Sequence, residues 1–336
     1  MRFGFFSVQD YHPELGVSPR DYFELLLERM RHAEALGYES FWLAEHHFAN
    51  YGLDPAPCVV LAAAARETRR LRLGTAISVL PFHNPLHVAE SYALVDLLSN
   101  GRLNFGAGSG YLKHEFAGHN VPQEEKAARF DEALAIVLRA WSGERFSYQG
   151  RFYTVTDVQL QVRPVQQPRP PVWIATLRPE GAYHIGRKGF WLMGVPYVTV
   201  PRLADLRAVI ESYQQGYREA GHDPAAADIV MALHVYVAET EAAAERDARA
   251  ALERYIRTRL YAKGGDWDGL RASQLVAIGT PDTVAAVVET LQATGATHLA
   301  CLMDFGGLEH ARVLRSMELF QREVLPRFAP VAAAPA

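Results

Sequence analysis

The sequence predicts an α/β fold, a TIM-type (β/α)8 barrel, from two observations. Short apolar runs alternate with segments of helical periodicity along most of the 336 residues, and this alternation indicates parallel strands joined by right-handed crossovers. Eight such apolar runs are present, which favours a closed barrel over an open sheet. We therefore expect one domain over residues 1–328, followed by a disordered tail rich in alanine and proline over 329–336.

The expected elements follow one another in order along the chain. The strands are expected at 3–8, 40–44, 71–80, 103–107, 171–176, 190–195, 229–237 and 297–302. The helices are expected at 19–36, 57–68, 86–98, 123–141, 179–188, 201–220, 240–260, 281–294 and 308–325. The first helix illustrates the reasoning, because Ser18 can cap its free amides, Pro19 suits its first turn and Gly37 is a typical stop.

Two stretches interrupt this order. Residues 144–171, between strands four and five, contain two short apolar and aromatic runs on either side of Gln149-Gly150, which predicts a β-hairpin. Residues 263–273, between strands seven and eight, are rich in glycine and aspartate and contain Trp267. This second stretch is either a mobile lid over the barrel mouth or a flexible surface connection.

Composition excludes several classes of function. The formal net charge of -4 gives no reason to expect a nucleic acid or a membrane as partner, and no apolar run approaches the ~20 residues that span a bilayer. The apolar run at the N-terminus is too short for a signal peptide. Cys58 and Cys301 lie far apart without metal-type spacing, so we expect free thiols in a cytoplasmic protein.

The most informative polar residues follow strand two. In a barrel of this type, functional residues gather at the C-terminal ends of the strands, and here Glu45, His46 and His47 occupy such a position. Neighbouring residues in an extended segment point to opposite sides, so the two histidines are not expected to share one metal ion. A catalytic or ligand-contacting His46, oriented by Glu45, is favoured over a buried hydrogen-bonded cluster.

Three other strand ends offer ligand contacts. After strand three, small residues that include Ala76 would let a flat ligand approach the backbone. After strand four, the run 106–111 (GAGSGY) could cradle a phosphate, but its spacing and its place in the chain do not match the dinucleotide fingerprint. After strand five, Arg178 precedes Pro179 at a helix start, which is either a phosphate site or an ordinary helix N-terminus.

Taken together, the motifs resemble the bacterial luciferase-like family of flavin-dependent monooxygenases. The matching segments lie in family order and span most of the chain: 41–48 (FWLAEHHF), 71–76 (LRLGTA), 80–85, 96–108 (DLLSNGRLNFGAG), 171–175 (PVWIA) and 279–283 (GTPDT). The resemblance implies a barrel with an insertion after strand seven. It also implies FMN at the C-terminal mouth, used in its reduced form as a co-substrate together with dioxygen.

The resemblance also implies roles for individual residues. His46 matches the catalytic histidine of the family, and Glu45 matches a residue that lines the flavin. Ala76-Ile77 matches a non-proline cis peptide under the flavin ring, and the backbone of Thr176 and Leu177 matches the segment that holds the flavin phosphate. Luciferase has a reactive cysteine and a phosphate-binding arginine where this chain has Gly108 and Ser109. Light emission is therefore not expected. The nearby Arg178 could replace the positive charge of the missing arginine.

The expected function is therefore a flavin-dependent monooxygenase that oxidises a small, largely apolar organic substrate. Four aromatic residues are expected to line its pocket, namely Phe6, Trp42, Phe48 and Tyr111. A separate reductase would supply reduced FMN, and the family commonly forms homodimers through helices that correspond to residues 57–98. The alternatives are a deazaflavin-dependent hydride-transfer enzyme of the same fold, a non-catalytic flavin-binding protein and, less favoured, a metal-dependent hydrolase.

Overall fold

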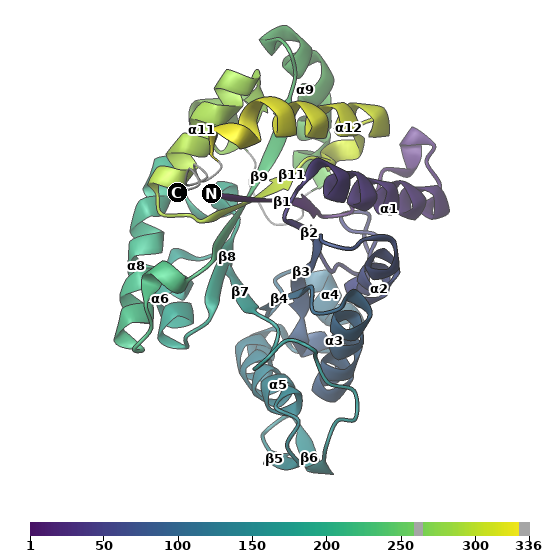
Figure 1. The fold of residues 1–336 in the computed structure, drawn as a ribbon, viewed down its shortest axis with the longest axis vertical. Helices are drawn as coiled ribbons and strands as arrows, with labels where there is room; N and C mark the ends of the chain where they lie inside the picture. The colour runs from purple at the N-terminus through teal and green to yellow at the C-terminus, as the bar shows by residue number, and fades with distance from the viewer. Residues whose placement is uncertain (259–264, 329–336) are drawn as a thin grey trace, which may run out of the picture.

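Parallel strands form a closed barrel surrounded by helices in the computed structural model, which describes residues 1–258 and 265–328 (Figure 1). Within these residues, one nine-stranded sheet has the order β10-β9-β11-β1-β2-β3-β4-β7-β8, and the pairing of β8 with β9 closes the barrel. The eight barrel strands are β1 Arg2–Ser7, β2 Ser40–Leu43, β3 Arg72–Val79, β4 Leu103–Gly108, β7 Val172–Thr176, β8 Trp191–Gly194, β9 Ile229–Val237 and β11 His298–Leu302. The predicted barrel and its eight strands are confirmed.

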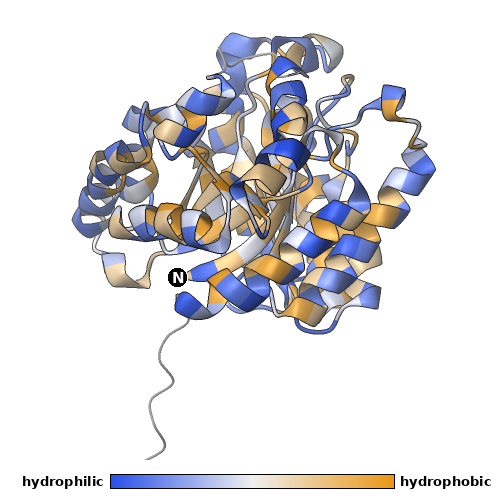
Figure 2. Ribbon diagram, turned by 90° about the horizontal axis from the view of Figure 1, so that it is seen from above, coloured by the Kyte–Doolittle hydropathy of each residue, from blue (hydrophilic) through white to orange (hydrophobic). Residues whose placement is uncertain are grey.

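The helices cover the outside of the barrel with amphipathic faces, as the alternation of blue and orange along them shows (Figure 2). Their bounds are α1 Pro19–Leu36, α2 Pro57–Glu67, α3 Pro85–Ser99, α4 Lys113–Gly118, α5 Lys126–Trp141, α6 Pro179–Arg187, α7 Pro196–Thr199, α8 Leu206–Glu219, α9 Glu241–Thr258, α10 Trp267–Ala272, α11 Pro281–Ala293 and α12 His310–Leu319. The expected caps of α1 are present, since the Ser18 hydroxyl accepts a hydrogen bond from the Asp21 amide and Gly37 has a φ of 82°. None of the described helices has the length and hydropathy needed to cross a membrane.

The inside of the barrel is filled by large aromatic side chains. Trp42 on β2 and Trp173 on β7 pack edge to face with ring centroids 5.1 Å apart, and both are buried. Gly74 on β3 makes room for them, because a Cβ atom there would lie 2.2 Å from the Trp42 ring. The packed interior leaves the C-terminal ends of the strands as the place for a cavity.

Both interruptions of the barrel order contain regular structure. The predicted hairpin is confirmed, since β5 Phe146–Gln149 and β6 Thr154–Val158 pair antiparallel and lie beside the end of α5 (Figure 1). Between β9 and β11, the sequence reasoning missed β10 Val276–Gly279, a four-residue strand that pairs with the end of β9.

The stretch predicted as a lid or a surface connection contains regular structure over its described part. Residues 267–272 form α10, whose first turn is capped by the Asp266 carboxylate. Trp267 is 2% exposed, so this residue anchors the segment to the body of the protein. Residues 263 and 264 of that stretch, and the predicted tail over 329–336, lie outside the described residues. Cys58 and Cys301 are both free thiols.

Candidate active site

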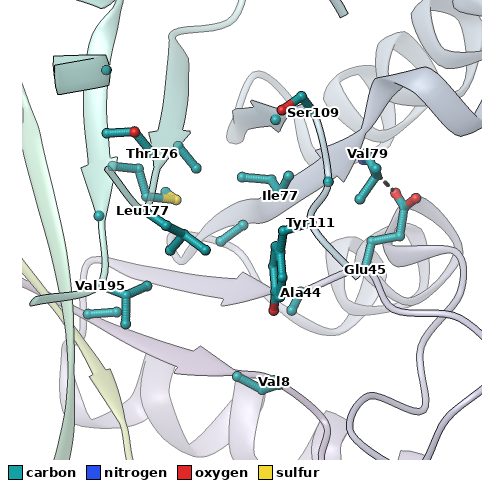
Figure 3. A pocket seen from close by; sticks show the side chains of 18 of the residues that line it. Val8, Ala44, Glu45, Ile77, Val79, Ser109, Tyr111, Thr176, Leu177 and Val195 are labelled. Carbon is teal, nitrogen blue, oxygen red and sulfur yellow. Dashed lines mark hydrogen bonds between the residues drawn. The ribbon is translucent and has the colours of Figure 1, made fainter. Parts of the chain in front are cut away.

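The nine residues expected to be catalytic or to bind the cofactor line one cavity of about 830 Å³. The cavity lies at the C-terminal ends of the strands, the face expected for the site of an α/β barrel (Figure 3). The residues that the structure brings together there are Glu45, His46, Ala76, Ile77, Gly108, Ser109, Thr176, Leu177 and Arg178. Its volume is at the upper end of the range of roughly 300–1,000 Å³ for ligand sites, so a cofactor and a small substrate could both fit.

His46 is held at the cavity wall by a buried carboxylate from another element. Its Nδ1 atom lies 3.0 Å from Oε1 of Glu115, which is on α4 and is 1% exposed. The same oxygen accepts a hydrogen bond of 2.9 Å from the backbone amide of His47. Gly52 packs directly on the histidine, because a Cβ atom there would lie 2.6 Å from Cβ of His46. With Nδ1 engaged by Glu115, Nε2 is the ring nitrogen left to act on a ligand.

The prediction that Glu45 orients His46 is wrong. The Glu45 carboxylate bonds instead to Nε2 of His47 at 3.1 Å and to Nε2 of His83 at 2.7 Å. Its second oxygen accepts a hydrogen bond of 3.2 Å from the amide of Val79, drawn as a dashed line in Figure 3. Glu45 and Glu115 are both buried carboxylates near His46 and His47. Which carboxylate bonds to which histidine depends on how the loops fold, and the sequence alone does not show it.

Glu45 forms buried ion-pair contacts with His47 and His83. Burial alone would raise the pKa of Glu45, but the hydrogen bonds from His47 and His83 outweigh it and lower that pKa to about 2. Burial likewise opposes the charge on His83, whose bond to Glu45 nevertheless raises its pKa above the ordinary value. The ligand atoms of Glu45, His47 and His83 lie within 4.8 Å of one another, and two imidazoles with one carboxylate are a set that zinc accepts. Hydrogen bonds between these atoms also account for their closeness. Neighbouring side chains in an extended segment were expected to point to opposite sides. The His46 ring bonds to Glu115 and the His47 ring bonds to Glu45.

The wall formed by β3 and β4 suits a flat ligand. The peptide bond between Ala76 and Ile77 is cis, as the resemblance implied. Gly108 at the end of β4 lies against Ile77, since a Cβ atom there would be 2.2 Å from its Cδ1 atom. Ile77 is labelled near the middle of Figure 3, with Ser109 above it in this view. A side chain at position 108 would therefore collide with Ile77 on this wall of the cavity.

The start of α6 offers a hydrogen-bond donor to an anion. Arg178 is the N-cap residue, and its side chain makes no capping bond. Pro179 has no N–H and the Gly181 amide donates to the carbonyl oxygen of Arg178 at 3.1 Å, so the Glu180 amide is the donor of the first turn left for a ligand. The Thr176 hydroxyl accepts a hydrogen bond of 3.1 Å from the Arg178 amide, and Gly181 fits closely over Thr176 because a Cβ atom there would lie 2.5 Å from Oγ1. Glu180, also in the first turn, is exposed.

Sequence reasoning missed a second cation in this region. Lys126, the first residue of α5, lines the cavity and donates a hydrogen bond of 3.2 Å from Nζ to the carbonyl oxygen of Gly110. Burial lowers the pKa of Lys126, and the nearby Arg178 guanidinium lowers it further. Two cations that repel each other beside an open helix N-terminus form a site that an anion would stabilise. The helical period of residues 126–141 gave no sign that this lysine faces the cavity.

The apolar lining is confirmed for three of the four predicted aromatic residues. Phe6, Trp42 and Tyr111 line the cavity. The prediction for Phe48 is wrong, because its side chain is 67% exposed. Phe48 has a positive φ of 61° and packs towards α4, where a Cβ atom on Gly118 would lie 2.3 Å from its ring. The turn after His47 therefore carries this ring out of the cavity.

The chain is similar to proteins of one family. Residues 1–298 match the family model of luciferase-like monooxygenases. Limonene 1,2-monooxygenase of Rhodococcus erythropolis is 30% identical over 90% of this chain and 80% of its own length. The oxygenase component of the flavin-dependent trigonelline monooxygenase of Acinetobacter baylyi is 27% identical over 72% of this chain and 66% of its own length. An F420-dependent glucose-6-phosphate dehydrogenase of Amycolatopsis mediterranei is 33% identical, over 51% of this chain and 52% of its own length.

Solved structures show the same fold. The monooxygenase RslO1 of Streptomyces bottropensis has a TM-score of 0.92 and 32% identity, with 98% of this chain and all of that chain covered. The oxygenating constituent of 3,6-diketocamphane monooxygenase from Pseudomonas putida, solved in complex with FMN, has a TM-score of 0.84 and 21% identity over 97% of this chain and 98% of that chain.

Proposed function

This chain is an oxidoreductase that belongs to the luciferase-like monooxygenase family, and we propose that it uses reduced FMN and dioxygen to oxidise a small, largely apolar organic substrate. The observation that carries the proposal is that one cavity combines two positively charged side chains, a histidine and a largely apolar lining. Lys126 and Arg178 form an anion site at one end, His46 lies at the wall, and the rest of the lining is mainly apolar. A molecule with a phosphate, a flat ring and an adjoining apolar partner matches this arrangement.

The residues present fit the parts of FMN. We assign the phosphate to the Glu180 amide in the first turn of α6, the backbone of Thr176 and Leu177, and the two cations Lys126 and Arg178. The ring system is assigned to the wall that carries Ala76, Ile77, Gly108 and Ser109, where the glycine leaves the space that a side chain would fill. Glu45 lines the same cavity, although its carboxylate faces His47 and His83.

Reduced FMN supplies the two electrons with which one oxygen atom of dioxygen enters the substrate and the other leaves as water. His46 is the catalytic residue in this proposal, and its Nε2 atom gives or takes a proton at the reacting groups. Glu115 accepts a hydrogen bond from Nδ1–H of His46, and its negative charge stabilises the ring whenever the ring is positively charged. The apolar walls formed by Phe6, Trp42 and Tyr111 keep water away from the reaction.

A separate reductase is proposed as the source of reduced FMN. The relative from Acinetobacter baylyi is named as the oxygenase component of its enzyme, which supports a division of reduction and oxygenation between two proteins. The similarity to an F420-dependent dehydrogenase supports a second candidate, hydride transfer with a deazaflavin and without dioxygen. The two candidates differ in whether oxygen from the gas appears in the product.

The test is to supply the purified chain with FMN, NADH, a flavin reductase and ¹⁸O₂, and to offer limonene and other apolar compounds. We expect a product that carries one labelled oxygen atom, with oxygen uptake that rises when the substrate is added. Absence of labelled product with FMN, together with anaerobic oxidation of a substrate when oxidised F420 is supplied instead, would favour hydride transfer. Tight retention of flavin with no oxygen uptake that depends on any substrate would favour a non-catalytic flavin-binding protein.

A homodimer is proposed through α2 and α3. Exposed apolar side chains gather on these helices, which suggests a surface covered by a partner: Val59, Leu94, Leu97 and Leu98. Replacing Leu94 and Leu97 by lysine should convert a dimer into a monomer, measured by light scattering after size-exclusion chromatography. A native chain that already runs as a monomer at micromolar concentration would contradict this.

A further inference from the structure

A row of three tyrosine hydroxyls lies in the cavity beside His46. The hydroxyl of Tyr255 on α9 is 3.3 Å from that of Tyr51 and 3.2 Å from that of Tyr197 on α7. All three side chains line the cavity, and Tyr51 and Tyr255 are only 4% and 0% exposed. The Tyr51 ring also lies 4.6 Å from the His46 ring, centroid to centroid. Three elements that are distant in the sequence therefore bring phenol groups together next to the proposed catalytic residue.

The cavity that contains this row has a largely apolar lining, and the buried His234 ring packs against Tyr197 and Tyr255 with centroids 5.0 and 4.6 Å apart. Apolar lining residues come from β9 and β11 and from the segments that follow β1 and β8: Val8, Val195, Val230, Ala232 and Ala300. Figure 3 shows Val8 and Val195 on the side of the cavity away from Ser109. The tyrosine row shares this cavity with the wall assigned to the FMN ring and with Lys126 and Arg178, and it consists of other residues.

We infer that the tyrosine row binds the oxygen atom of the substrate, and that the substrate is an apolar compound with a carbonyl or hydroxyl oxygen rather than a plain hydrocarbon. A phenol hydroxyl both donates and accepts hydrogen bonds, so a row of such groups can serve either kind of oxygen. The apolar walls would enclose the carbon skeleton. This inference rests on the proposed function, because it names the substrate class for the same cavity.

The row would also place the substrate relative to His46. An oxygen held at the Tyr51 hydroxyl would stay in the same part of the cavity as His46, whose ring packs on the Tyr51 ring with centroids 4.6 Å apart. A hydrocarbon would fill the apolar space without being held at one end. We therefore expect the row to contribute both selectivity for oxygenated compounds and a fixed orientation.

The test compares two ligands with the same carbon skeleton, cyclooctanone and cyclooctane, by calorimetric titration of the full chain. The native chain should bind the ketone more tightly. Replacing Tyr255 and Tyr197 together by phenylalanine should weaken ketone binding by about 3- to 10-fold and leave hydrocarbon binding unchanged, as expected for the loss of a neutral hydrogen bond. Tyr213→Phe is the matched control, since it removes another buried hydroxyl, bonded to the carbonyl oxygen of Phe190 at 3.0 Å outside this cavity.

Equal affinity for both ligands, an equal loss for both in the double variant, or no measurable ketone binding would overturn the inference. Titration of the same proteins with FMN separates the two proposals. A native chain that prefers the ketone but does not bind FMN would refute the proposed function and leave the tyrosine row as an oxygen-binding site. A chain that binds FMN without any preference for the ketone would refute the inference about the tyrosine row and leave the proposed function standing.

Discussion

Replacing His46 by glutamine should lower substrate oxidation by about 10²- to 10⁴-fold, the range expected for the loss of a general acid or base. Glutamine has a similar length and can still form hydrogen bonds, but it cannot exchange a proton near neutral pH. Because the anion site at α6 is formed by other residues, the affinity for FMN should change little. The measurement is the rate of product formation under saturating reduced FMN, together with an FMN titration of the same variant.

The matched control for this variant is Glu115→Gln. Its side-chain oxygen can still accept the hydrogen bonds that reach Glu115 from His46 and His47, so the loop should keep its shape. The negative charge that supports a protonated His46 is lost, and we expect a smaller fall in the rate than for His46→Gln. An unchanged rate in His46→Gln would remove His46 from the chemistry.

Reversing the charge of Lys126 and Arg178 together should nearly abolish FMN binding. A hydrogen bond to a charged group contributes about 1.5–3 kcal/mol, so the loss of two such contacts corresponds to at least a 100-fold weaker affinity. The added glutamates would also repel the phosphate at the N-terminus of α6. The measurement is an anaerobic titration of Lys126→Glu/Arg178→Glu with reduced FMN.

Riboflavin provides the decisive control for this second prediction, because it has the same ring but no phosphate. The double variant should bind riboflavin about as well as the native chain does. Arg187→Glu serves as the control protein, since it reverses a charge at the far end of α6, where Arg187 pairs with Glu219 at 3.4 Å. An equal loss for FMN and riboflavin would indicate a general disruption of the cavity and contradict the assignment of the phosphate.

The barrel could be predicted from the sequence because each strand and helix can be recognised from its own residues. Each apolar run and each capped amphipathic segment is visible without knowledge of the rest of the chain, as Ser18 and Gly37 around α1 illustrate. The residues at the strand ends could be predicted as well, since the fold places all strand ends at one face. The cavity accordingly contains residues from β2, β3, β4 and β7 that were selected on this ground.

The remaining site residues could not be predicted, because their positions depend on how separate loops and helices fold against one another. Glu115 reaches His46 from α4, a six-residue helix with too little periodicity to be recognised in the sequence. Lys126 and Tyr255 stand on long helices, where a polar residue ordinarily faces solvent. Phe48 shows the opposite error, since an aromatic residue just after His46 and His47 was expected to line the cavity, and its backbone turns it outward.

The most direct test of the central claim, that this cavity is a reduced-FMN site, is the relative affinity of the chain for reduced FMN and reduced F420 in anaerobic titrations. We expect saturable binding of reduced FMN, at least about 10-fold tighter than that of reduced F420, which corresponds to about 1.4 kcal/mol. Tighter binding of F420, or no saturable binding of reduced FMN, would contradict the claim.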